Sequence, residues 1–533
     1  EDPYLTTKCA TNFINGVQST GVSACAKHFA LNEQENQRRF LNTICDERTM
    51  HEYYLRPFHD VLKVSNPHTV MSSYNRVNGE YASESSYLLK DILRTKWQYD
   101  GAVISDWGAA QDRVKSIKNG LNVEMPGPSE FIDEVTAALK SGDLTESEVD
   151  ESLLPLLKLR DKINNNKNKG QEVDLNIGHI LAQDVSREAI VLLENDGILP
   201  LEKNIKIGVI GAFAKTPRMN GGGSATLKPF ITENPLKELQ KEFTVEYCEG
   251  YIEENTNSDL LEEVQTVAAN NDIILYFTGT TENLETEGKE REHMNLPEGH
   301  ITVFNEIKKY GKQVIVILNN GGPLDLSVLE GHMNALIEAW FLGSANAKAL
   351  VEIITGDTNP SGRLSETIPL CIENTPHYGI FPAKEDEVNY SGDIIRNGYR
   401  YYDTHKYPVR YPFGYGLSYA TFEYSNLVLD KKILHDDDIL TVKVTIKNTS
   451  DIKGKEVVQL YVHDQDSYYP RPYKELKAFT KIELSPKEEK VVSFTLDDNA
   501  FNIYSVDFQD FRVESGLFTI MIGKDVLNMV LED

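Results

Sequence analysis

Short apolar runs alternate with amphipathic stretches over the first 165 residues. The runs predict strands at 22–29, 69–72, 101–104 and 120–125, and the stretches between them predict helices, among them 48–64 and 129–141. This alternation is typical of a parallel sheet with crossover helices. Polar and aromatic residues follow each predicted strand, at the sheet edge where α/β proteins carry their functional groups.

The number of strand–helix units limits the fold of this first region. We count four units in residues 1–165, whereas a closed (β/α)8 barrel has eight over about 250 residues. The chain also opens directly on a predicted helix after Glu1-Asp2-Pro3. We therefore expect that residues 1–165 are the C-terminal part of a TIM-like barrel whose first part lies outside this chain, or else that the fold is unusual.

A second α/β region follows an Asn-, Lys- and Gln-rich stretch. Residues 166–178 predict a linker, and 179–200 predict a helix that runs into a turn at Pro200. Beyond it, apolar runs alternate with helical segments, which predicts a second α/β domain over 201–424. Its buried strands are expected at 205–211, 273–279, 314–319 and 336–340.

The apolar period changes to two from about residue 425. Alternate positions are apolar in three successive segments: 440–446, 458–462 and 492–496. About 100 residues with this period, divided by turns, predict a C-terminal β-sandwich over 425–533.

The charge balance narrows the class of partner. The chain has 54 Lys and Arg against 82 Asp and Glu, a formal charge of −28. Nucleic acid and anionic membranes need basic patches, so both are disfavoured as partners. A neutral small substrate such as a sugar is compatible with this charge, although the charge could equally serve solubility alone.

The cysteines indicate the redox state of the compartment, and the apolar runs indicate whether the chain could span a membrane. Five cysteines at wide, irregular spacing predict neither a disulfide framework nor a zinc site, which favours a reducing compartment and a cytoplasmic location. No apolar run reaches the ~18 residues of a membrane span. Self-association into a homo-oligomer is left open.

Asp106 is the main candidate for a catalytic carboxylate. It ends an apolar strand and is followed by Trp107 and Gly108, which places an acid at the mouth of the sheet beside an aromatic plane. Glycoside hydrolysis usually needs two carboxyl groups on opposite sides of the scissile bond. The alternative is that Asp106 only caps the next helix, a role for which Asp is favoured.

An acidic loop could supply the second carboxyl group. Glu282, Glu285, Glu287, Glu290 and Glu292 follow a predicted strand. A proton-donating carboxyl group on a loop is one interpretation, and a solvated acidic loop is the other.

Other polar residues near strand ends are candidates for sugar binding. Lys27 and His28 can donate hydrogen bonds to hydroxyl groups, and Arg38 lies shortly after them. Structural roles are the alternative for all three, as core or rim packing is for Met71 and Tyr74.

Nucleotide and metal motifs are incomplete. Gly221-Gly222-Gly223-Ser224 lacks the Lys-Ser/Thr of a phosphate-binding loop, and His51-Glu52 lacks the second histidine of a zinc motif. We therefore expect no cofactor and no metal.

Together these pieces are far more specific than any one of them. In the first half they are Lys27-His28-Phe29, Gln34-Glu35-x-x-Arg38, Met71-Ser72-x-Tyr74-Asn75 and Ser105-Asp106-Trp107-Gly108. In the second half they are Glu287-Gly288-x-x-Arg291, Pro360-Ser361-Gly362-Arg363-Leu364 and Phe413-Gly414-Tyr415-Gly416-Leu417. In this order they resemble glycoside hydrolase family 3.

The resemblance implies a barrel, an α/β sandwich and a fibronectin type III-like domain, and a retaining mechanism. Asp106 would be the nucleophile and Glu287 the acid/base, with Glu285 as the nearby alternative. In such an enzyme the two carboxyl groups lie about 5–5.5 Å apart. Lys27, His28, Arg38 and Tyr74 would bind the hydroxyls of the terminal sugar, and Met71 and Trp107 would form walls of its subsite.

Two details favour the β-glucosidase type within this family. Ala30-Leu31-Asn32-Glu33 replaces the loop of the N-acetylglucosaminidase branch, and Trp107 stands where the xylosidase branch tends to have Cys. We therefore expect release of terminal glucose from β-glucosides. The alternative is a truncated, catalytically silent relative that only binds carbohydrate or a partner subunit, because the upstream Asp-Gly-Pro segment of family barrels is not in this chain.

Overall fold

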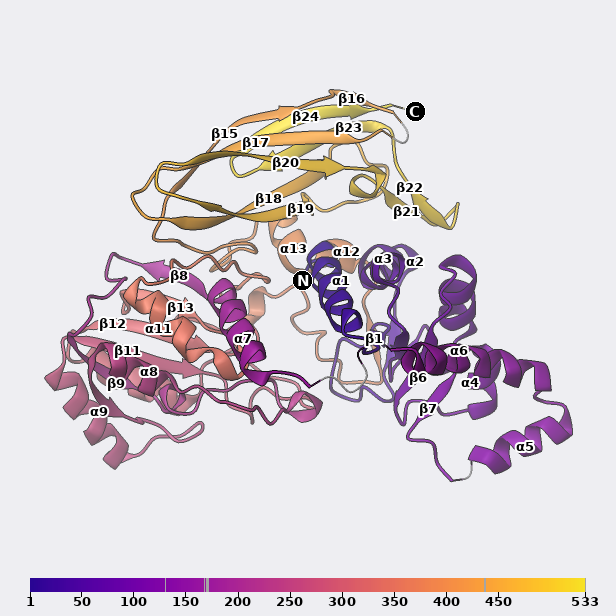
Figure 1. Ribbon diagram of the computed structural model, residues 1–533, viewed down its shortest axis with the longest axis horizontal. Coiled ribbons are helices and arrows are strands. Elements are labelled where there is room, and N and C mark those ends of the chain that lie inside the picture. The colour runs from indigo at the N-terminus through magenta and orange to yellow at the C-terminus, as the bar shows by residue number, and fades with distance from the viewer. Residues whose placement is uncertain (130, 167, 169–171, 436–437, 533) are drawn as a thin grey trace.

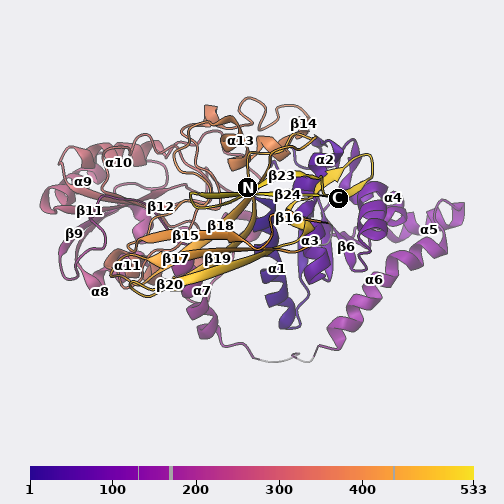
Figure 2. The same ribbon diagram turned by 90° about the horizontal axis from the view of Figure 1, so that it is seen from above.

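The computed structural model describes residues 1–533 except 130, 167, 169–171, 436–437 and 533. Two α/β regions lie side by side, and a β-sandwich lies across them (Figure 1). Seen from above, the sandwich strands cover the junction between the two α/β regions (Figure 2). The fold therefore brings three successive parts of the chain to one junction.

The first region is a four-stranded parallel sheet in the order β1-β3-β6-β7. Its strands are β1 (Cys25–Phe29), β3 (Thr69–Ser72), β6 (Ala102–Trp107) and β7 (Val123–Met125). All four predicted strands are confirmed. The parallel order places the carboxyl ends of these strands at one edge, where His28, Tyr74 and Asp106 meet.

Helices separate and follow these strands. They are α1 (Pro3–Ser19), α2 (Glu47–Thr49), α3 (Arg56–Ser65), α4 (Arg113–Asn119), α5 (Phe131–Ser141) and α6 (Glu146–Asn164), with π-helical segments η1 (Met50–Tyr54) and η3 (Tyr87–Lys96) and the 3₁₀ turn η2 (Ala82–Glu84). The helix predicted over 48–64 is thus three consecutive segments. Their apolar faces pack on the sheet, as the fully buried Leu88, Leu89 and Ile92 of η3 illustrate.

The second region is a six-stranded sheet in the order β10-β9-β11-β12-β13-β8. Its strands are β8 (Val191–Asn195), β9 (Lys206–Ile210), β10 (Thr244–Cys248), β11 (Ile273–Gly279), β12 (Gln313–Asn319) and β13 (Ala335–Glu338). All pair in parallel except β8, which is antiparallel to β13.

One expectation for this region was wrong. The helix predicted over 179–200 ends at Ala189, because α7 spans Leu175–Ala189 and β8 begins two residues later. The run Ile190–Leu193 is almost fully buried and pairs with β13, so tertiary burial overrides its helical surroundings.

The remaining helices of this region are α8 (Pro235–Glu242), α9 (Ser258–Asn270), α10 (Glu298–Lys308), α11 (Ala347–Thr355), α12 (Asp393–Arg396) and α13 (Gly398–His405). Short 3₁₀ turns are η4 (Ala212–Ala214), η5 (Gly223–Ala225), η6 (Gly343–Ala345) and η7 (Ile372–Asn374). A continuous apolar core fills the space between the helices and the sheet.

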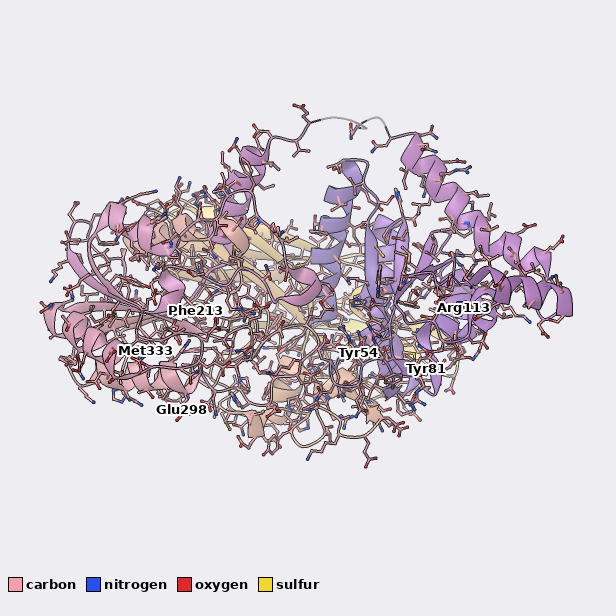
Figure 3. The ribbon with its side chains drawn as sticks, turned by 90° about the horizontal axis from the view of Figure 1, so that it is seen from below. Tyr54, Tyr81, Arg113, Phe213, Glu298 and Met333 are labelled. Atoms are coloured by element: carbon pink, nitrogen blue, oxygen red, sulfur yellow. The ribbon has the colours of Figure 1, made fainter. Side chains whose placement is uncertain are left out.

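A small sheet joins the two α/β regions. Strand β14 (Glu387–Asn389) extends from the second region and pairs in parallel with β2 (Asn42–Ile44) of the first. Beyond β2 come β4 (Arg76–Val77) and β5 (Glu80–Tyr81). Tyr54 of η1 lies in the central part of the molecule (Figure 3) and donates to Asp393 Oδ2 at 2.7 Å. These contacts fix the loop after β1 against the second region.

The third region is the predicted β-sandwich. Its two sheets have the orders β15-β17-β20 and β16-β24-β23-β18-β19, and β21 pairs with β22 in a separate hairpin. Its strands are β15 (Phe422–Leu429), β16 (Ile433–Leu434), β17 (Leu440–Asn448), β18 (Gly454–Asp464), β19 (Glu475–Leu484), β20 (Glu489–Leu496), β21 (Ile503–Ser505), β22 (Asp510–Arg512), β23 (Gly516–Ile522) and β24 (Asp525–Leu531), with the 3₁₀ turn η8 (Asp498–Ala500). The alternating Leu440, Val442, Val444 and Ile446 are all fully buried, which confirms the period of two.

Two kinds of feature, a membrane-spanning helix and a cluster of metal ligands, are absent from the described residues. No helix in this part of the chain is long and apolar enough to cross a bilayer. Over the same residues, no three His, Cys, Asp or Glu side chains gather as a metal site would require.

Candidate active site

Asp106 lies at the carboxyl end of β6, between β3 and β7. Its Oδ1 accepts a hydrogen bond from the backbone N–H of Trp107 at 2.7 Å. Helix α4 is capped by Asp112, whose Oδ1 accepts from Lys115 N at 2.9 Å. The helix-cap alternative for Asp106 is therefore wrong, and its carboxylate is directed to the edge of the sheet.

His28 lies beside this carboxylate. Its Nε2 is 3.3 Å from Asp106 Oδ2. Burial lowers the pKa of His28, and the Lys27 ammonium lowers it further, against the opposing effect of Asp106. His28 is thus a neutral imidazole near pH 7, with Nε2 directed toward the Asp106 carboxylate. Lys27 itself is exposed.

Tyr74 approaches Asp106 from the loop after β3. Its hydroxyl hydrogen-bonds the Asp106 carboxyl group, and burial together with that negative charge raises the pKa of Tyr74. The guanidinium of Arg38 lies 5.0 Å from the centre of the Tyr74 ring. Tyr74 therefore connects the carboxylate of the first region to the arginine that faces the second region.

The two predicted wall residues differ in exposure. The side chain of Trp107 is 56% exposed, so its ring is available as an apolar surface at the rim. Met71 is partly exposed on β3 and stands opposite Ile104 of β6 in the sheet. Trp107 directly follows Asp106 in the sequence, and Ile104, the strand partner of Met71, lies two positions before Asp106.

The second region contributes Glu287 to this group. Both terminal nitrogens of Arg38 lie 3.2 Å from Glu287 Oε1, and the backbone N–H of Ser224 donates to Oε2 at 2.5 Å. Residues 249 positions apart in sequence are thereby in contact across the two α/β regions. The contact places the acidic loop after β11 at the sheet edge that carries Asp106.

These partners set the protonation of Glu287. The Ser224 amide lowers the pKa of Glu287 most, and the Arg38 guanidinium lowers it further. The acid/base of a retaining enzyme must hold a proton near neutral pH so that it can donate this proton to the leaving oxygen in the first step. The Arg38 ion pair opposes a protonated state of Glu287.

Glu285, the alternative acid/base, is held inside the second region. Its Oε2 accepts from Thr280 Oγ1 at 2.5 Å and from the Gly321 N–H at 3.1 Å. Both partners belong to loops that follow β11 and β12. These contacts direct Glu285 away from Arg38, whereas Glu287 reaches it.

Three further features of the site were not predicted from the sequence. The run Gly221–Ser224, for which the sequence offered only a phosphate-loop interpretation, packs against Glu287. A Cβ on Gly223 would lie 2.5 Å from Glu287 Cβ. Glu35 pairs with Arg38 at 2.8 Å, and Glu290 accepts from the N–H of Glu35. For Glu35 and Glu290, the only signal in the sequence was that they lie close to Arg38 and Gly288, respectively.

A large cavity lies beside this group of residues. Its volume is about 1460 Å³, and Lys27 and Glu290 line it together with parts of α1 and of the segment 366–402. Asp106 and Glu287 are not among its lining residues. The cavity thus opens next to the candidate site rather than between its two carboxyl groups.

Comparison with protein families matches three parts of the chain. Residues 1–159 match the glycosyl hydrolase family 3 N-terminal domain, and 190–419 match the family 3 C-terminal domain. Residues 456–526 match a fibronectin type III-like domain. The three matches follow the three regions of the fold.

Individual proteins match over nearly the whole chain. A thermostable beta-glucosidase B of Acetivibrio thermocellus is 41% identical, over all of this chain and 71% of that protein. An exo-alpha-(1->6)-L-arabinopyranosidase of Bifidobacterium breve is 36% identical, over 98% of this chain and 70% of that protein. The crystal structure of a Bifidobacterium adolescentis GH3 beta-glucosidase has a TM-score of 0.94 and 36% identity, over all of this chain and 79% of that one. The chain belongs to glycosyl hydrolase family 3.

Proposed function

We propose that this chain acts as a retaining glycoside hydrolase that releases terminal glucose from β-glucosides, with Asp106 as nucleophile and Glu287 as acid/base. One observation supports this most: contacts link the two carboxyl groups, from two different regions, through Tyr74 and Arg38. Family membership and the 41% identical beta-glucosidase support the reaction class. They favour an enzyme over a catalytically silent binding protein.

In the first step, an oxygen of Asp106 attacks the anomeric carbon and the bond to the aglycone oxygen breaks. The leaving oxygen takes the proton of Glu287, so the products are a glycosyl ester on Asp106, a free alcohol and the Glu287 carboxylate. In the second step that carboxylate takes a proton from water, the hydroxide attacks the anomeric carbon, and Asp106 is released.

The neighbouring residues have distinct parts in this scheme. The hydroxyl of Tyr74 donates to Asp106 and His28 lies beside it, and these contacts orient the carboxylate. Arg38 and Lys27 present donors to the hydroxyls of the sugar. A sugar hydroxyl that accepts from Arg38 would draw that charge away from Glu287 and favour its protonated form.

The glucoside preference needs a separate test, because one relative is named an arabinopyranosidase. Rates on matched aryl β-glucoside, β-xyloside and α-L-arabinopyranoside would rank the three sugars. We expect the glucoside to have the highest kcat/KM. A higher value for either pentoside would replace glucose in the proposal while leaving the mechanism intact.

The roles of the carboxyl groups are tested with a slow substrate. A 2-deoxy-2-fluoro-β-glucoside should form a stable ester, and peptide mass mapping should locate it on Asp106. Asp106→Asn should abolish both the ester and turnover, whereas Asp112→Asn, at the cap of α4, should retain both. An ester on another carboxylate would overturn the assignment.

The acid/base is tested by comparing two neighbouring acids. Glu287→Gln should lower kcat on poorly activated glucosides roughly 10²- to 10⁴-fold, and azide should partly restore turnover of activated ones. Glu285→Gln should give no azide rescue, because its contacts are with Thr280 and Gly321. Rescue in Glu285→Gln alone would exchange the two roles.

A further inference from the structure

Two loops from different regions cap each other's backbone amides next to Glu287. The first is the docking loop, residues 30–41 after β1, and the second is the acid loop, residues 280–297 after β11. Glu290 accepts hydrogen bonds from the backbone N–H groups of Glu35 and Asn36. In return, Glu35 Oε2 accepts from the N–H of Gly288 at 2.9 Å.

Both contacts involve residues that follow Glu287 closely in the sequence. Gly288 directly follows it, and Glu290 is three positions away. Thr286 and Lys289 form an antiparallel bridge, so the segment between them is a tight turn. Gly288 has a φ of +85°, a left-handed conformation that suits glycine and helps to close the turn. Because this turn is short, a displacement of its ends also displaces Glu287.

Glu35 has a second contact that bears on Glu287. Its Oε2 lies 2.8 Å from Arg38 Nη1, and Arg38 also contacts Glu287. Two carboxylates, those of Glu35 and Glu287, therefore share one guanidinium. Backbone N–H groups of Ser224, Gly288, Glu35 and Asn36 supply the other donors to these two carboxylates and to Glu290. Hydrogen bonds to ionised acceptors are about twice as strong as neutral ones.

We propose that Glu290 and Glu35 are positioning residues that dock the acid loop on the docking loop and thereby set where Glu287 stands relative to Asp106. The inference rests on the proposed function for its catalytic part, since it assumes that Glu287 is the acid/base. The docking itself does not depend on that assumption.

Hydrogen exchange tests the docking directly. In the full chain, Glu290→Ala should speed amide exchange about tenfold or more in peptides that cover 34–38 and 286–290, because two charge-assisted hydrogen bonds are lost. Glu290→Gln, which retains an acceptor oxygen, should have a smaller effect. Glu292→Ala, an exposed acid of the same loop, is the matched control and should change neither peptide. Unchanged exchange in Glu290→Ala would overturn the proposal whatever the activity.

Leaving-group dependence tests the positioning. A displaced general acid slows poor leaving groups but not those that depart without a proton. Glu290→Ala should therefore lower kcat roughly 10²-fold on alkyl glucosides and less than about threefold on a dinitrophenyl glucoside. An equal loss on both substrates would mean a merely structural role and would overturn the positioning.

The outcomes also separate this inference from the proposed function. If Glu287→Gln shows no acid/base signature, the proposed function fails, and the exchange result still decides the docking. If Glu287→Gln behaves as expected while Glu290→Ala resembles the unaltered chain in both measurements, only the present inference fails.

Discussion

Arg38 lies between the carboxylates of Glu35 and Glu287, and its charge is one cause of the lowered pKa of Glu287. Arg38→Met should therefore raise that pKa. Because the protonated acid is the active form in the first step, the alkaline limb of the kcat/KM profile should move upward by roughly one pH unit. The measurement is the pH–rate profile on a glucoside with a poor leaving group.

Arg39→Met is the matched control for this change. Arg39 is exposed and lies 5.3 Å from the Tyr74 ring, close to the site, whereas the ion pair of Glu287 is with Arg38. Its alkaline limb should stay in place. A limb that moves equally in both variants would show that general charge, rather than the Arg38 contact, sets the pKa.

Gly223 provides a second residue-scale prediction. It has a φ of +57°, and a Cβ there would lie 2.5 Å from both Cβ and Oε2 of Glu287. Gly223→Ala should displace Glu287 and lower kcat roughly 10²-fold, the scale of a lost general acid. Gly221→Ala adds a Cβ with no atom within 4 Å and should retain the rate. Steady-state kinetics on one aryl glucoside compare the pair.

At this scale, sequence motifs identified the candidate side chains better than the contacts that hold them in place. Asp106 and His28 each end an apolar strand, so their meeting at one sheet edge follows from parallel pairing. Glu290 accepts from the backbone N–H of Glu35, and the backbone N–H of Ser224 donates to Glu287; both contacts join segments that are far apart in sequence. No residue pattern encodes such a contact, because an N–H donor is present at every position except proline.

At the scale of elements, the sequence predicted long buried strands and missed short pairings. Strands such as β11 and β12 stand out as apolar runs, whereas β2 and β14 are three residues each and have no apolar pattern. Their pairing depends on how the two regions meet. The loop geometry around Glu287 depends on the same meeting, which is why it too was not predicted.

Arg218 anchors the start of the acid loop after β11. Its guanidinium donates to the carbonyl oxygens of Thr280, Thr281 and Glu285 and lies 4.3 Å from the Phe341 ring. Arg218→Lys retains the charge but loses the planar fork, so the loop should loosen at a cost of about 2 kcal/mol. Hydrogen exchange of a peptide covering 280–287 should speed up and kcat should fall.

A nearby exposed cation controls for charge in that experiment. Lys215 pairs with Glu249 at 3.2 Å on the surface of the same region. Lys215→Met should leave exchange over 280–287 and kcat unchanged, as surface ion pairs contribute little. If Arg218→Lys left the same exchange unchanged, the loop would be held by other contacts.

At the scale of the whole molecule, one buried charge cluster joins the three regions. Asp2 caps α1, Arg400 lies on α13, and Glu475 begins β19 of the sandwich. Arg400 Nη2 is 3.8 Å from Asp2 Oδ2 and 3.7 Å from Glu475 Oε2. The Tyr399 hydroxyl donates to Asp2 at 2.8 Å and accepts from the Leu476 N–H at 3.0 Å. The cluster fixes the sandwich over the junction that carries the site (Figure 1).

Glu475 is the carboxylate in this cluster that contacts Arg400, Arg471 and Lys477. It accepts from Arg471 Nη2 at 2.7 Å and from Lys477 Nζ at 3.0 Å, and all three side chains are nearly or largely buried. Burial alone would raise the pKa of Glu475, but these cations outweigh it and hold the pKa well below 4.5. Its stabilising contribution is thus fully present above the unfolded pKa and is lost as pH falls from there through the lower folded pKa.

Glu475→Leu should uncouple the sandwich from the rest of the molecule. Removing Glu475 from this buried ionic network leaves Lys477 uncompensated and Arg471 paired with Asp464 alone, at a cost of about 3–5 kcal/mol. Calorimetry should show the sandwich unfolding at least about 10 °C below its temperature in the unaltered chain. Lys453→Ala, which breaks an exposed 2.6 Å pair with Glu483 in the same sandwich, should shift it little. Equal shifts in the two variants would mean that the cluster does not join the regions, because any lost charge pair would then have the same effect.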